Sequence, residues 1–475
     1  MILKKKIIKQ ENPAKPRQEP GRPGQAPPDK QIIPDEHKTK AWNVTVNMGY
    51  GHMRASYPLL DMSNGENYII ANDYEGIPKD DRRIWKNSRK VYEALSRMKQ
   101  IPVIGDEIFE LLDRWQEIPS FYPRRDLSKP SFQVKEFYKL FSNGFCKHLI
   151  ESLEPAGLPM INTFFIPALA ADFFGYKHDI YAVITDTDFS RAWVPLEPQK
   201  TKIKYFAPTK RAEERLKQYG VPAKNIFLTG FPLPTDLVGM EYEHIKPALG
   251  ARLINLDTDG NFMRHNEESV CDLLGGCLMR QSTHPLTLMF AVGGAGAQRE
   301  MVGQMLGAFK NRLRQGKMKL ILVAGSRKDV LKHFEKSIDR VALTRQIGKS
   351  IEIIYNENRN KYFAAFNDAL QKTDILWTKP SELSFYAGLG VPIIMAPPIG
   401  SQEEFNEDWL RNVGAGIPQR DPRYVDQWLD DMLRSGWLAR AAVNGFINAP
   451  KRGAYRIKEI VAHRKQTMPE PVEPV

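Results

Sequence analysis

Short apolar runs alternate with stretches of helical periodicity along most of this chain, and the alternation constrains the fold more than any other feature. Runs such as WNVTVN (42–47), MINTFF (160–165) and KYFAPT (204–209) each precede a segment whose apolar residues recur three or four positions apart. Strands separated by helices form parallel β-α-β units, which place ligands beyond the carboxyl ends of the strands. The pattern therefore predicts an α/β fold with its site at the strand ends.

The alternation occurs twice, in two arrays separated by a stretch that breaks it. The second array opens with PLTLMFAVGGAG (285–296), and the total of 475 residues is long enough for two or three domains. We predict two Rossmann-like, doubly wound domains that face one another across a cleft. The predicted parts are a disordered basic arm at 1–40, a first domain at 41–235 with a helical insertion at 82–153, a linker or insertion at 236–284, a second domain at 285–422, helices at 423–465 and a tail at 466–475.

Charge and cysteine content limit the class of protein. Residues 1–40 carry ten Lys or Arg against five Asp or Glu and are rich in Pro and Gly, which favours disorder. They include no apolar segment typical of a secretory signal, and the chain has no apolar run of about 18 residues that would cross a membrane. Cys146, Cys271 and Cys277 lack C-x-x-C spacing and cannot all pair, which favours a reduced, cytoplasmic compartment.

Residues 82–148 combine basic and aromatic side chains. This stretch has fourteen Lys or Arg against eight Asp or Glu, interleaved with residues such as Trp85, Phe132 and Tyr138. The mixture suits an anionic membrane surface or a nucleic acid. It equally suits a helical subdomain whose aromatic residues are core and whose charges are solvated. Both interpretations stay open from the sequence.

A glycine loop follows the first strand. Gly49 and Gly51 flank Tyr50, and His52 comes next, just before an amphipathic stretch. Glycines at a strand-to-helix turn let the backbone approach a ligand closely, and an imidazole there can take a proton at neutral pH. Asp186 and Asp188, at the end of a strand that would face this loop, are candidates to orient His52 or to act as the base themselves. We predict that His52, Asp186 and Asp188 carry the chemistry.

A second glycine loop, Val292-Gly293-Gly294-Ala295-Gly296, joins a strand to a helix in the second array. Backbone N–H groups at such a turn, together with the helix dipole, form a cradle suited to a diphosphate. The loop is neither a Walker A sequence nor a complete dinucleotide fingerprint, so a tight turn without a ligand stays an alternative.

Several further motifs follow in a recognisable order. These are Asp374-Ile-Leu-Trp-Thr-Lys-Pro-Ser-Glu-Leu-Ser384, Gly390-Val-Pro-Ile-Ile394, Gly400-Ser-Gln-Glu-Glu-Phe-Asn406 and Gly414-Ala-Gly416. They are preceded by Gly49-Tyr-Gly-His-Met-Arg-Ala-Ser56, Thr185-Asp186 and the run from Pro208-Thr-Lys-Arg-Ala through Gly220-Val to Thr229-Gly-Phe-Pro232. Together they resemble the GT-B glycosyltransferases related to monogalactosyldiacylglycerol synthase and to the lipid-II-forming N-acetylglucosaminyltransferase. The resemblance covers about residues 43–235 and 286–417.

The resemblance implies a division of labour between the two domains. The first would hold the acceptor beside Gly49, Gly51 and His52, and the second would bind a nucleotide-diphosphate sugar. The residues that the resemblance and the loop chemistry assign to the donor are Gly293, Gly294, Gly296, Lys379, Ser381, Glu382, Ser384, Gln402, Glu403 and Asn406. No metal and no separate cofactor are expected, because the nucleotide sugar is itself the substrate.

Some positions differ from the family pattern. Tyr50 replaces a glycine, Ser381 replaces the glycine after Lys379-Pro380, and Phe385 stands where the family has its ribose-binding glutamate. Glu382, one helical turn earlier, is a candidate substitute for that glutamate.

The sequence thus predicts a metal-independent glycosyltransferase that uses a nucleotide-diphosphate sugar, with UDP as the expected nucleotide. The family's lipid acceptors suggest a lipid hydroxyl as acceptor and a peripheral place on the inner face of a membrane through residues 82–148, with no nucleic-acid partner. A nucleotide-sugar 2-epimerase of the same fold and a non-catalytic nucleotide-sugar-binding protein are the alternatives.

Overall fold

In the computed structural model of this chain, the strands of the described residues all pair in parallel. The structure describes residues 39–98, 118–276, 282–293, 298–398 and 400–463, and the chain from Thr39 onward forms one compact unit. The predicted basic arm lies almost wholly outside the described residues, and so do the tail, Cys277, Gly294 and Gly296.

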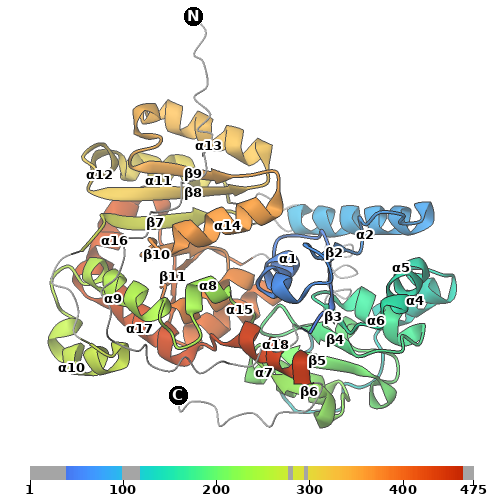
Figure 1. Cartoon of the computed structure of the whole chain (residues 1–475). Coiled ribbons are helices and arrows are strands. Elements are labelled where there is room, and N and C mark those ends of the chain that lie inside the picture. The colour runs from blue at the N-terminus through green and yellow to red at the C-terminus, as the bar shows by residue number, and fades with distance from the viewer. Residues whose placement is uncertain (1–38, 99–117, 277–281, 294–297, 399, 464–475) are drawn as a thin grey trace, which may run out of the picture. The chain divides into compact units, whose positions relative to one another are not determined.

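The first sheet has the strand order β2-β1-β3-β4-β5-β6 (Figure 1). Its strands are β1 (Trp42–Thr45), β2 (Ile69–Ile70), β3 (Met160–Asn162), β4 (Ile180–Val183), β5 (Ile203–Ala207) and β6 (Ile226–Leu228). The chain starts at β1, adds β2 on one side and then continues from β3 outward on the other side. The order of the strands therefore reverses between β1 and β3, and this reversal point is where ligands bind in open α/β sheets.

The second sheet has the order β12-β11-β10-β7-β8-β9. Its strands are β7 (Leu286–Ala291), β8 (Met318–Gly325), β9 (Ile351–Tyr355), β10 (Ile375–Thr378), β11 (Ile393–Met395) and β12 (Gly416–Pro418). Here the reversal lies between β7 and β10. Two parallel, doubly wound sheets confirm the predicted fold class.

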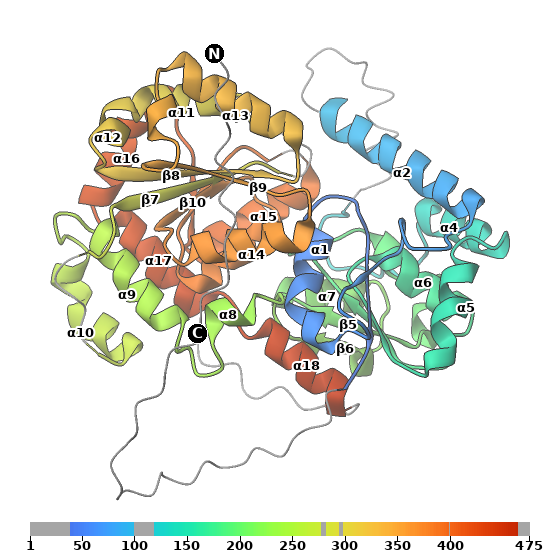
Figure 2. The same ribbon diagram turned by 45° about the horizontal axis from the view of Figure 1, so that its top comes forward.

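Helices lie on both faces of each sheet (Figures 1 and 2). Those of the first half are α1 (Gly51–Ser56), α2 (Lys79–Met98), α4 (Phe132–Ser142), α5 (Lys147–Leu153), α6 (Phe165–Phe173) and α7 (Lys210–Gln218). The others are α8 (Thr235–Val238), α9 (Ile245–Leu256), α10 (Met263–Leu274), α11 (Met301–Ala308), α12 (Lys310–Arg314), α13 (Lys328–Arg340), α14 (Arg359–Leu370), α15 (Ser401–Asn412), α16 (Val425–Arg434), α17 (Trp437–Asn448) and α18 (Gly453–His463).

Side-chain caps define the start of several of these helices. The Thr209 hydroxyl accepts a hydrogen bond from the backbone N–H of Ala212 at 3.1 Å and begins α7. The side chain of Asn358 caps α14 in the same way, through the N–H of Lys361. Such caps satisfy backbone donors that a helix leaves unpaired at its first turn.

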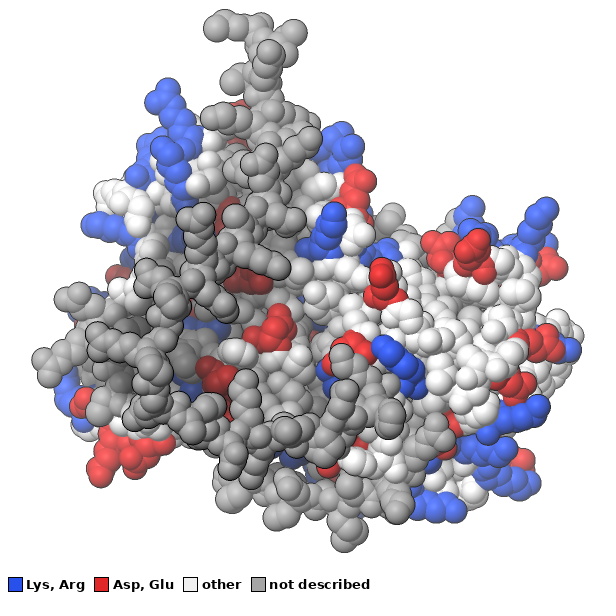
Figure 3. Space-filling model, viewed as in Figure 1, with Lys and Arg blue, Asp and Glu red and all other residues white. Residues whose placement is uncertain are grey.

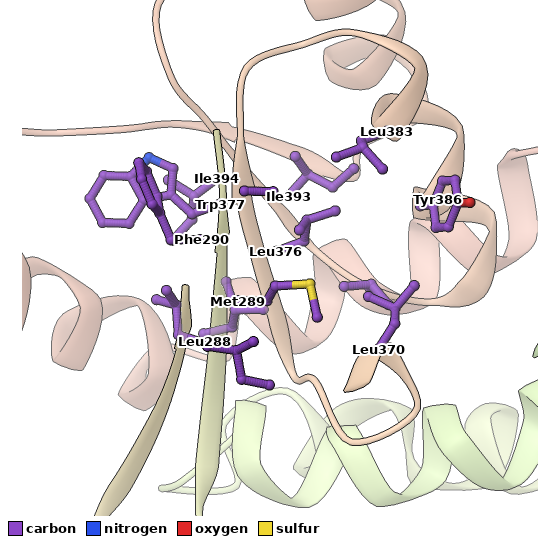
Figure 4. Close-up of a cluster of buried hydrophobic side chains, with 14 of the residues drawn as sticks. Leu288, Met289, Phe290, Leu370, Leu376, Trp377, Leu383, Tyr386, Ile393 and Ile394 are labelled. Atoms are coloured by element: carbon purple, nitrogen blue, oxygen red, sulfur yellow. The ribbon is translucent and has the colours of Figure 1, made fainter. Parts of the chain in front are cut away.

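The strands are apolar almost throughout because helices cover both faces of each sheet. In the second sheet Leu288, Phe290, Leu376 and Trp377 are fully buried in one large cluster. Figure 4 shows these side chains projecting from neighbouring strands, with Tyr386 contributed by a separate segment. The packed strands fix the positions of the loops that follow them.

Two helical segments extend this packing in ways that the order along the chain does not predict. In the segment 236–284, Leu249 and Leu253 of α9 and Val270 of α10 belong to the same buried cluster as the second sheet. At the other end, Ile457 and Val461 of α18 belong to a buried cluster with residues of the first sheet, and Figure 1 shows α18 beside β5 and β6. The last described helix therefore packs on the half of the molecule that the chain left about 220 residues earlier.

Candidate functional site

The polar residues of the predicted site gather where the strand order reverses in each sheet. In the first sheet His52 follows β1 and Thr163 follows β3, and Asp186 follows the adjacent β4. In the second sheet Gly293 follows β7 and Lys379 follows β10. Both groups thus lie at the carboxyl ends of parallel strands, the position that the fold offers to a ligand.

His52 is held by its ring nitrogen Nδ1, which lies 2.8 Å from the carbonyl oxygen of Thr163. A carbonyl oxygen can only accept, so Nδ1 carries the proton and Nε2 keeps its lone pair. The ring packs edge-on against Phe164, with 4.8 Å between centroids. Burial lowers the pKa of His52 to about 4, although the hydrogen bond to Thr163 opposes this shift. His52 is therefore neutral at pH 7 with the lone pair of Nε2 available to accept a proton, although its lowered pKa makes it a weaker base than Asp186.

Asp186 lies next to His52 through a shared neighbour. The Thr185 hydroxyl is 3.4 Å from both His52 Nδ1 and Asp186 Oδ2. The pKa of Asp186 is raised to about 6, chiefly by burial; the hydrogen bond from Asn406 lowers it, and the carboxylates of Glu382 and Glu403 raise it. A carboxyl group with a pKa near the working pH is suited to accept a proton.

Asp188, also predicted as a catalytic residue, is engaged in a different set of contacts from Asp186. Its side chain is fully buried, and both oxygens are held by arginines: Arg215 donates to Oδ1 and Oδ2 at 2.7 and 2.9 Å, and Arg211 donates to Oδ2 at 2.7 Å. A carboxylate paired in this way holds α7 against the strand end. Although Asp188 is only two residues from Asp186 in the chain, its side chain lies against the arginines of α7.

Asn406, predicted as a donor contact, is engaged with the first half of the chain. Its buried side chain accepts two hydrogen bonds from Thr187 and donates one to Asp186, and its contact with a donor stays a prediction. Gln402 and Glu403 precede it by about one turn on α15, and both are partly exposed. They remain candidates for contacts with the donor.

Lys379 and Gly293 form the diphosphate side of the predicted site. The lysine Nζ contacts Glu403 Oε1, and a Cβ atom built on Gly293 would lie only 2.5 Å from Lys379 Cε. The lysine side chain therefore occupies the space beside Gly293 where a Cβ atom would lie. The sequence predicted that a glycine here leaves this space open for a ligand. Gly294 and Gly296 lie outside the described residues.

The glycine loop of the first half is explained residue by residue. Gly49 has φ of +92°, a conformation that glycine adopts without strain. A Cβ atom on Gly51 would lie 3.3 Å from Glu382 Oε2, so this glycine makes room for a carboxylate. Tyr50, which replaces a family glycine, reaches the second half: its hydroxyl accepts a hydrogen bond from the backbone N–H of Ser326 at 2.8 Å.

Arg54 is the main residue that the sequence did not single out. It is buried on α1, its Nη2 donates to the Tyr362 hydroxyl at 2.9 Å, and its Nε lies 3.4 Å from Glu382 Oε1. The rings of Phe363 and Phe366 lie beside its guanidinium. Side chains of the two halves are thus in direct contact at α1, and the predicted cleft between the halves stays a prediction. The signal in the sequence that could have identified Arg54 is its position, two residues after His52 in the glycine loop.

The segment after Lys379 departs from the expected arrangement. Residues Glu382–Leu389 form a 3₁₀ helix, and Ser384 is fully buried in it, without a hydrogen-bond partner for its hydroxyl in the described part of the chain. Ser384, predicted as a donor contact, is thus enclosed in the packed segment, and its contact with a donor stays a prediction. Ser381 stays partly exposed at the start of the segment. Phe385 stacks on Phe231, with centroids 4.7 Å apart, and belongs to the core.

Glu382, the first residue of this 3₁₀ helix, is directed toward the predicted site. It pairs with Arg54 and raises the pKa of Asp186, so it faces the His52 side of the site. Across the residues that the structure describes, no group of three or more His, Cys, Asp or Glu side chains is arranged to hold a metal ion.

Sequence comparisons connect the chain to named enzymes. The processive diacylglycerol beta-glucosyltransferase of Bacillus cereus (strain B4264) is 23% identical over 328 residues, which span 68% of each chain. The enzyme of the same name from Bacillus mycoides (strain KBAB4) gives the same values. The chain is a distant relative of these glucosyltransferases. The resemblance to glycosyltransferases predicted from the motifs is therefore confirmed.

Other comparisons are broader. A family model described as a domain of unknown function (DUF6938) matches residues 277–347. Among solved structures, UDP-GlcNAc 2-epimerase from Neisseria meningitidis bound to UDP-GlcNAc is 12% identical with a TM-score of 0.44, covering 76% of this chain and 89% of that one. A glycosyltransferase from Rickettsia africae is 13% identical with a TM-score of 0.37, covering 80% and 95%.

Proposed function

We propose that this protein is a glycosyltransferase that moves a sugar from a nucleotide-diphosphate donor, UDP-linked, to a lipid hydroxyl. The observation that carries the proposal is the pairing of two proton acceptors at the reversal point of the first sheet. His52 has a fixed tautomer with Nε2 free, and Asp186 is its neighbour. Lys379 and Gly293 occupy the matching point of the second sheet. The distant relationship to diacylglycerol glucosyltransferases supports the same chemistry.

The proposed reaction needs one base and one cationic cradle. The acceptor oxygen bonds to the anomeric carbon as its proton passes to His52 Nε2 or to Asp186. The bond from that carbon to the diphosphate breaks, and the electron pair leaves with the nucleotide. Lys379 and the backbone N–H groups of the loop after β7 would stabilise the developing charge on the diphosphate. Attack from the opposite face would invert the anomeric configuration.

The proposal assigns no metal ion to the leaving group. The pair Asp186 and Asp188 has the spacing of a metal-binding D-x-D motif, but Asp188 is engaged by Arg211 and Arg215. Lys379, which can contact a phosphate directly, supplies the positive charge instead.

The lipid acceptor is suggested by the printed function of the relatives and by the surface of residues 118–148. Tyr122 and Phe132 expose 66% and 64% of their surface. Exposed basic residues of the same stretch are Arg124, Arg125, Lys129 and Lys135, whereas the exposed Lys139 and Lys147 pair with Glu136 and Glu151. Aromatic and basic side chains together suit an anionic membrane surface, and we propose a peripheral place on the cytoplasmic face. The described helices include none that is both long and apolar enough to cross a bilayer.

The basic residues of the predicted 82–148 stretch do not all belong to this surface. On α2, Arg82 lies near Asp73 and Arg83 near Asp80, so acidic residues offset the charge there. On the face shown in Figure 3, Lys and Arg side chains lie interspersed with Asp and Glu. Residues 99–117 lie outside the described residues. The membrane contact that we propose is therefore limited to the surface of residues 118–148, instead of the whole predicted stretch 82–148.

Acceptor-dependent nucleotide release tests the proposed function. The full-length protein is incubated with UDP-glucose, UDP-galactose or UDP-GlcNAc, with and without diacylglycerol in detergent micelles, and the products are followed by NMR. We expect free UDP and a glycolipid only when diacylglycerol is present. Formation of an epimerised nucleotide sugar in the absence of an acceptor would contradict the transferase proposal and indicate an epimerase. Binding of a nucleotide sugar without any product would indicate a binding protein.

Vesicle binding tests the membrane contact separately. We expect the protein to sediment with phosphatidylglycerol vesicles but not with phosphatidylcholine vesicles, and to be released by salt. Phe132→Ser combined with Lys135→Glu should abolish sedimentation. The control Trp437→Ser, which changes an exposed aromatic residue of α17 in the other half, should not. Equal binding to both vesicle types would contradict the electrostatic contact.

A further inference from the structure

The buried amide of Asn406 links the donor-side helix α15 to the strand end that carries Asp186. Its Oδ1 accepts two hydrogen bonds from Thr187, from the backbone N–H at 3.0 Å and from the hydroxyl at 2.9 Å. Its Nδ2 donates to Asp186 Oδ1 at 3.2 Å. The three bonds join residues about 220 positions apart.

The orientation of this amide follows from its partners. The N–H of Thr187 can only donate, so the atom of Asn406 that faces it is the oxygen. The NH₂ group then necessarily points at Asp186. An NH₂ group facing a carboxyl oxygen favours the ionised form of the carboxyl group, which is the form that can accept a proton.

We propose that Asn406 is a positioning residue for Asp186: it fixes the carboxylate in place and keeps it ionised for proton transfer. The proposal rests on the proposed glycosyltransferase function and deepens it. In this role Asn406 acts through Asp186, since its polar atoms are engaged with Asp186 and Thr187.

The charges around Asp186 show why such a donor is needed. Glu382 and Glu403 both disfavour its ionised form, together with burial. Their own cationic partners are Arg54 for Glu382 and Lys379 for Glu403, and neither of these cations is hydrogen-bonded to Asp186 in the described contacts. His52 is neutral at pH 7, so it offers no compensating charge. The amide of Asn406 and the Thr185 hydroxyl are the donors that face the carboxylate.

The position of Asn406 on α15 connects this role to the donor. Gln402 and Glu403, the candidates for sugar contacts, lie in the first turn of the same helix. Phe405 of this helix also lies against the guanidinium of Arg211, with 4.6 Å to the ring centroid. The same helix therefore carries the candidate donor contacts Gln402 and Glu403 and, about one turn later, Asn406, which holds Asp186, one of the two proposed proton acceptors of the first half.

A thermodynamic cycle tests the proposal without relying on activity. The free energy of unfolding is measured by urea from pH 4 to 9 for the full-length wild type and for Asp186→Asn, and again for both in the Asn406→Ala background. With Asn406 present, the free energy of unfolding of Asp186→Asn minus that of the wild type should increase with pH and level off near pH 6. The reason is that the raised pKa of Asp186 costs the folded wild type stability as its carboxyl group ionises. In the Asn406→Ala background this difference should level off about one to two pH units higher, because a hydrogen bond to the carboxylate is lost. The same displacement is expected in the acid limb of kcat/KM.

Two further variants keep the result interpretable. Asn406→Asp is isosteric and retains the bonds to Thr187, but it replaces the NH₂ group by an oxygen, so it should displace the levelling-off point upward as well. Asn367→Ala removes another buried asparagine, on α14, and should leave the pH dependence unchanged. Identical levelling-off points with and without Asn406 would overturn the proposal. Absence of any transfer by the wild type would overturn the proposed function, while the stability cycle would still decide the role of Asn406.

Discussion

Nη2 of Arg54 donates a hydrogen bond of 2.9 Å to the hydroxyl of Tyr362, which lies 308 positions further along the chain. The guanidinium also lies 4.2 Å from the centroid of the Phe366 ring, and its Nε is 3.4 Å from Glu382 Oε1. The helix that carries His52 is therefore docked onto the second half by a buried cation among aromatic rings. Removing one partner of a buried ion pair is far more costly than removing both.

Arg54→Ala should destabilise the protein by about 3–5 kcal/mol, since it leaves the largely covered Glu382 without its cation and removes the contacts with the rings. Urea unfolding of the purified variant measures this. The matched control is Arg83→Ala, whose ion pair with Asp80 is highly exposed (74% and 81%) and should cost less than about 1 kcal/mol. Equal effects of the two substitutions would show that Arg54 does not hold the halves together.

The imidazole of His52 should make folding stability depend on pH. Its pKa is lowered to about 4 in the folded protein from an ordinary value of 6.5, so between these values the unfolded chain binds a proton that the folded protein does not. Stability should therefore be full above pH 6.5 and fall as the pH decreases to about 4, by about 1–3 kcal/mol. The difference in unfolding free energy between wild type and His52→Gln, measured from pH 4 to 8, isolates this contribution. A difference independent of pH would place His52 in a solvated environment.

Gly293→Ala should weaken donor binding by displacing Lys379, because the new Cβ would meet the lysine Cε at 2.5 Å. We expect the Kd for a nucleotide sugar to rise by about tenfold, or about 1.4 kcal/mol, with little loss of stability because the lysine side chain can move. Calorimetric titration provides the measurement. Gly303→Ala on α11, where nothing lies within 4 Å of the new Cβ, should leave the affinity unchanged and slightly raise stability. Unchanged affinity in both variants would separate Lys379 from the donor.

Phe385→Glu, which restores the family's residue, should not restore a ribose contact. Phe385 is buried between Phe231 and Trp409, with ring centroids at 4.7 and 5.2 Å, so a carboxylate there would be buried without a partner. We expect a loss of stability of several kcal/mol and no gain in nucleotide affinity, whereas Phe385→Leu should cost about 1–2 kcal/mol. Tighter nucleotide binding by a folded Phe385→Glu variant would show that the segment can turn toward the donor.

The ends of the strands could be predicted from the sequence because neighbouring residues in the chain carry the signal. Apolar runs followed by glycine, as at Gly49 and Gly293, identify turns where parallel strands end, and parallel order brings such turns to one edge of a sheet. The positions of His52 and Lys379 at strand ends could therefore be predicted before their neighbours were known. The fold class follows from the same regularity.

The partners of the acidic residues could not be predicted in this way. Asp186 and Asp188 are two positions apart on one turn, yet Asp188 is neutralised by Arg215, 27 positions away, while Asp186 meets Asn406, 220 positions away. Which carboxylate stays available depends on how α7 and α15 pack against the strand end. The same holds for Ser384, because a 3₁₀ helix instead of an α-helix changes which face of the segment is buried.

The most direct test of the account is the His52→Ala variant, assayed for glycolipid formation and, separately, for donor affinity by calorimetry. If the neutral imidazole accepts the acceptor's proton, turnover should fall by about 10²–10⁴-fold, the range typical of a general base. The Kd for the nucleotide sugar should change little, because the proposed donor contacts lie on the second half. Turnover close to that of the wild type would contradict the central claim, and it would leave Asp186 as the base and His52 as a packing residue.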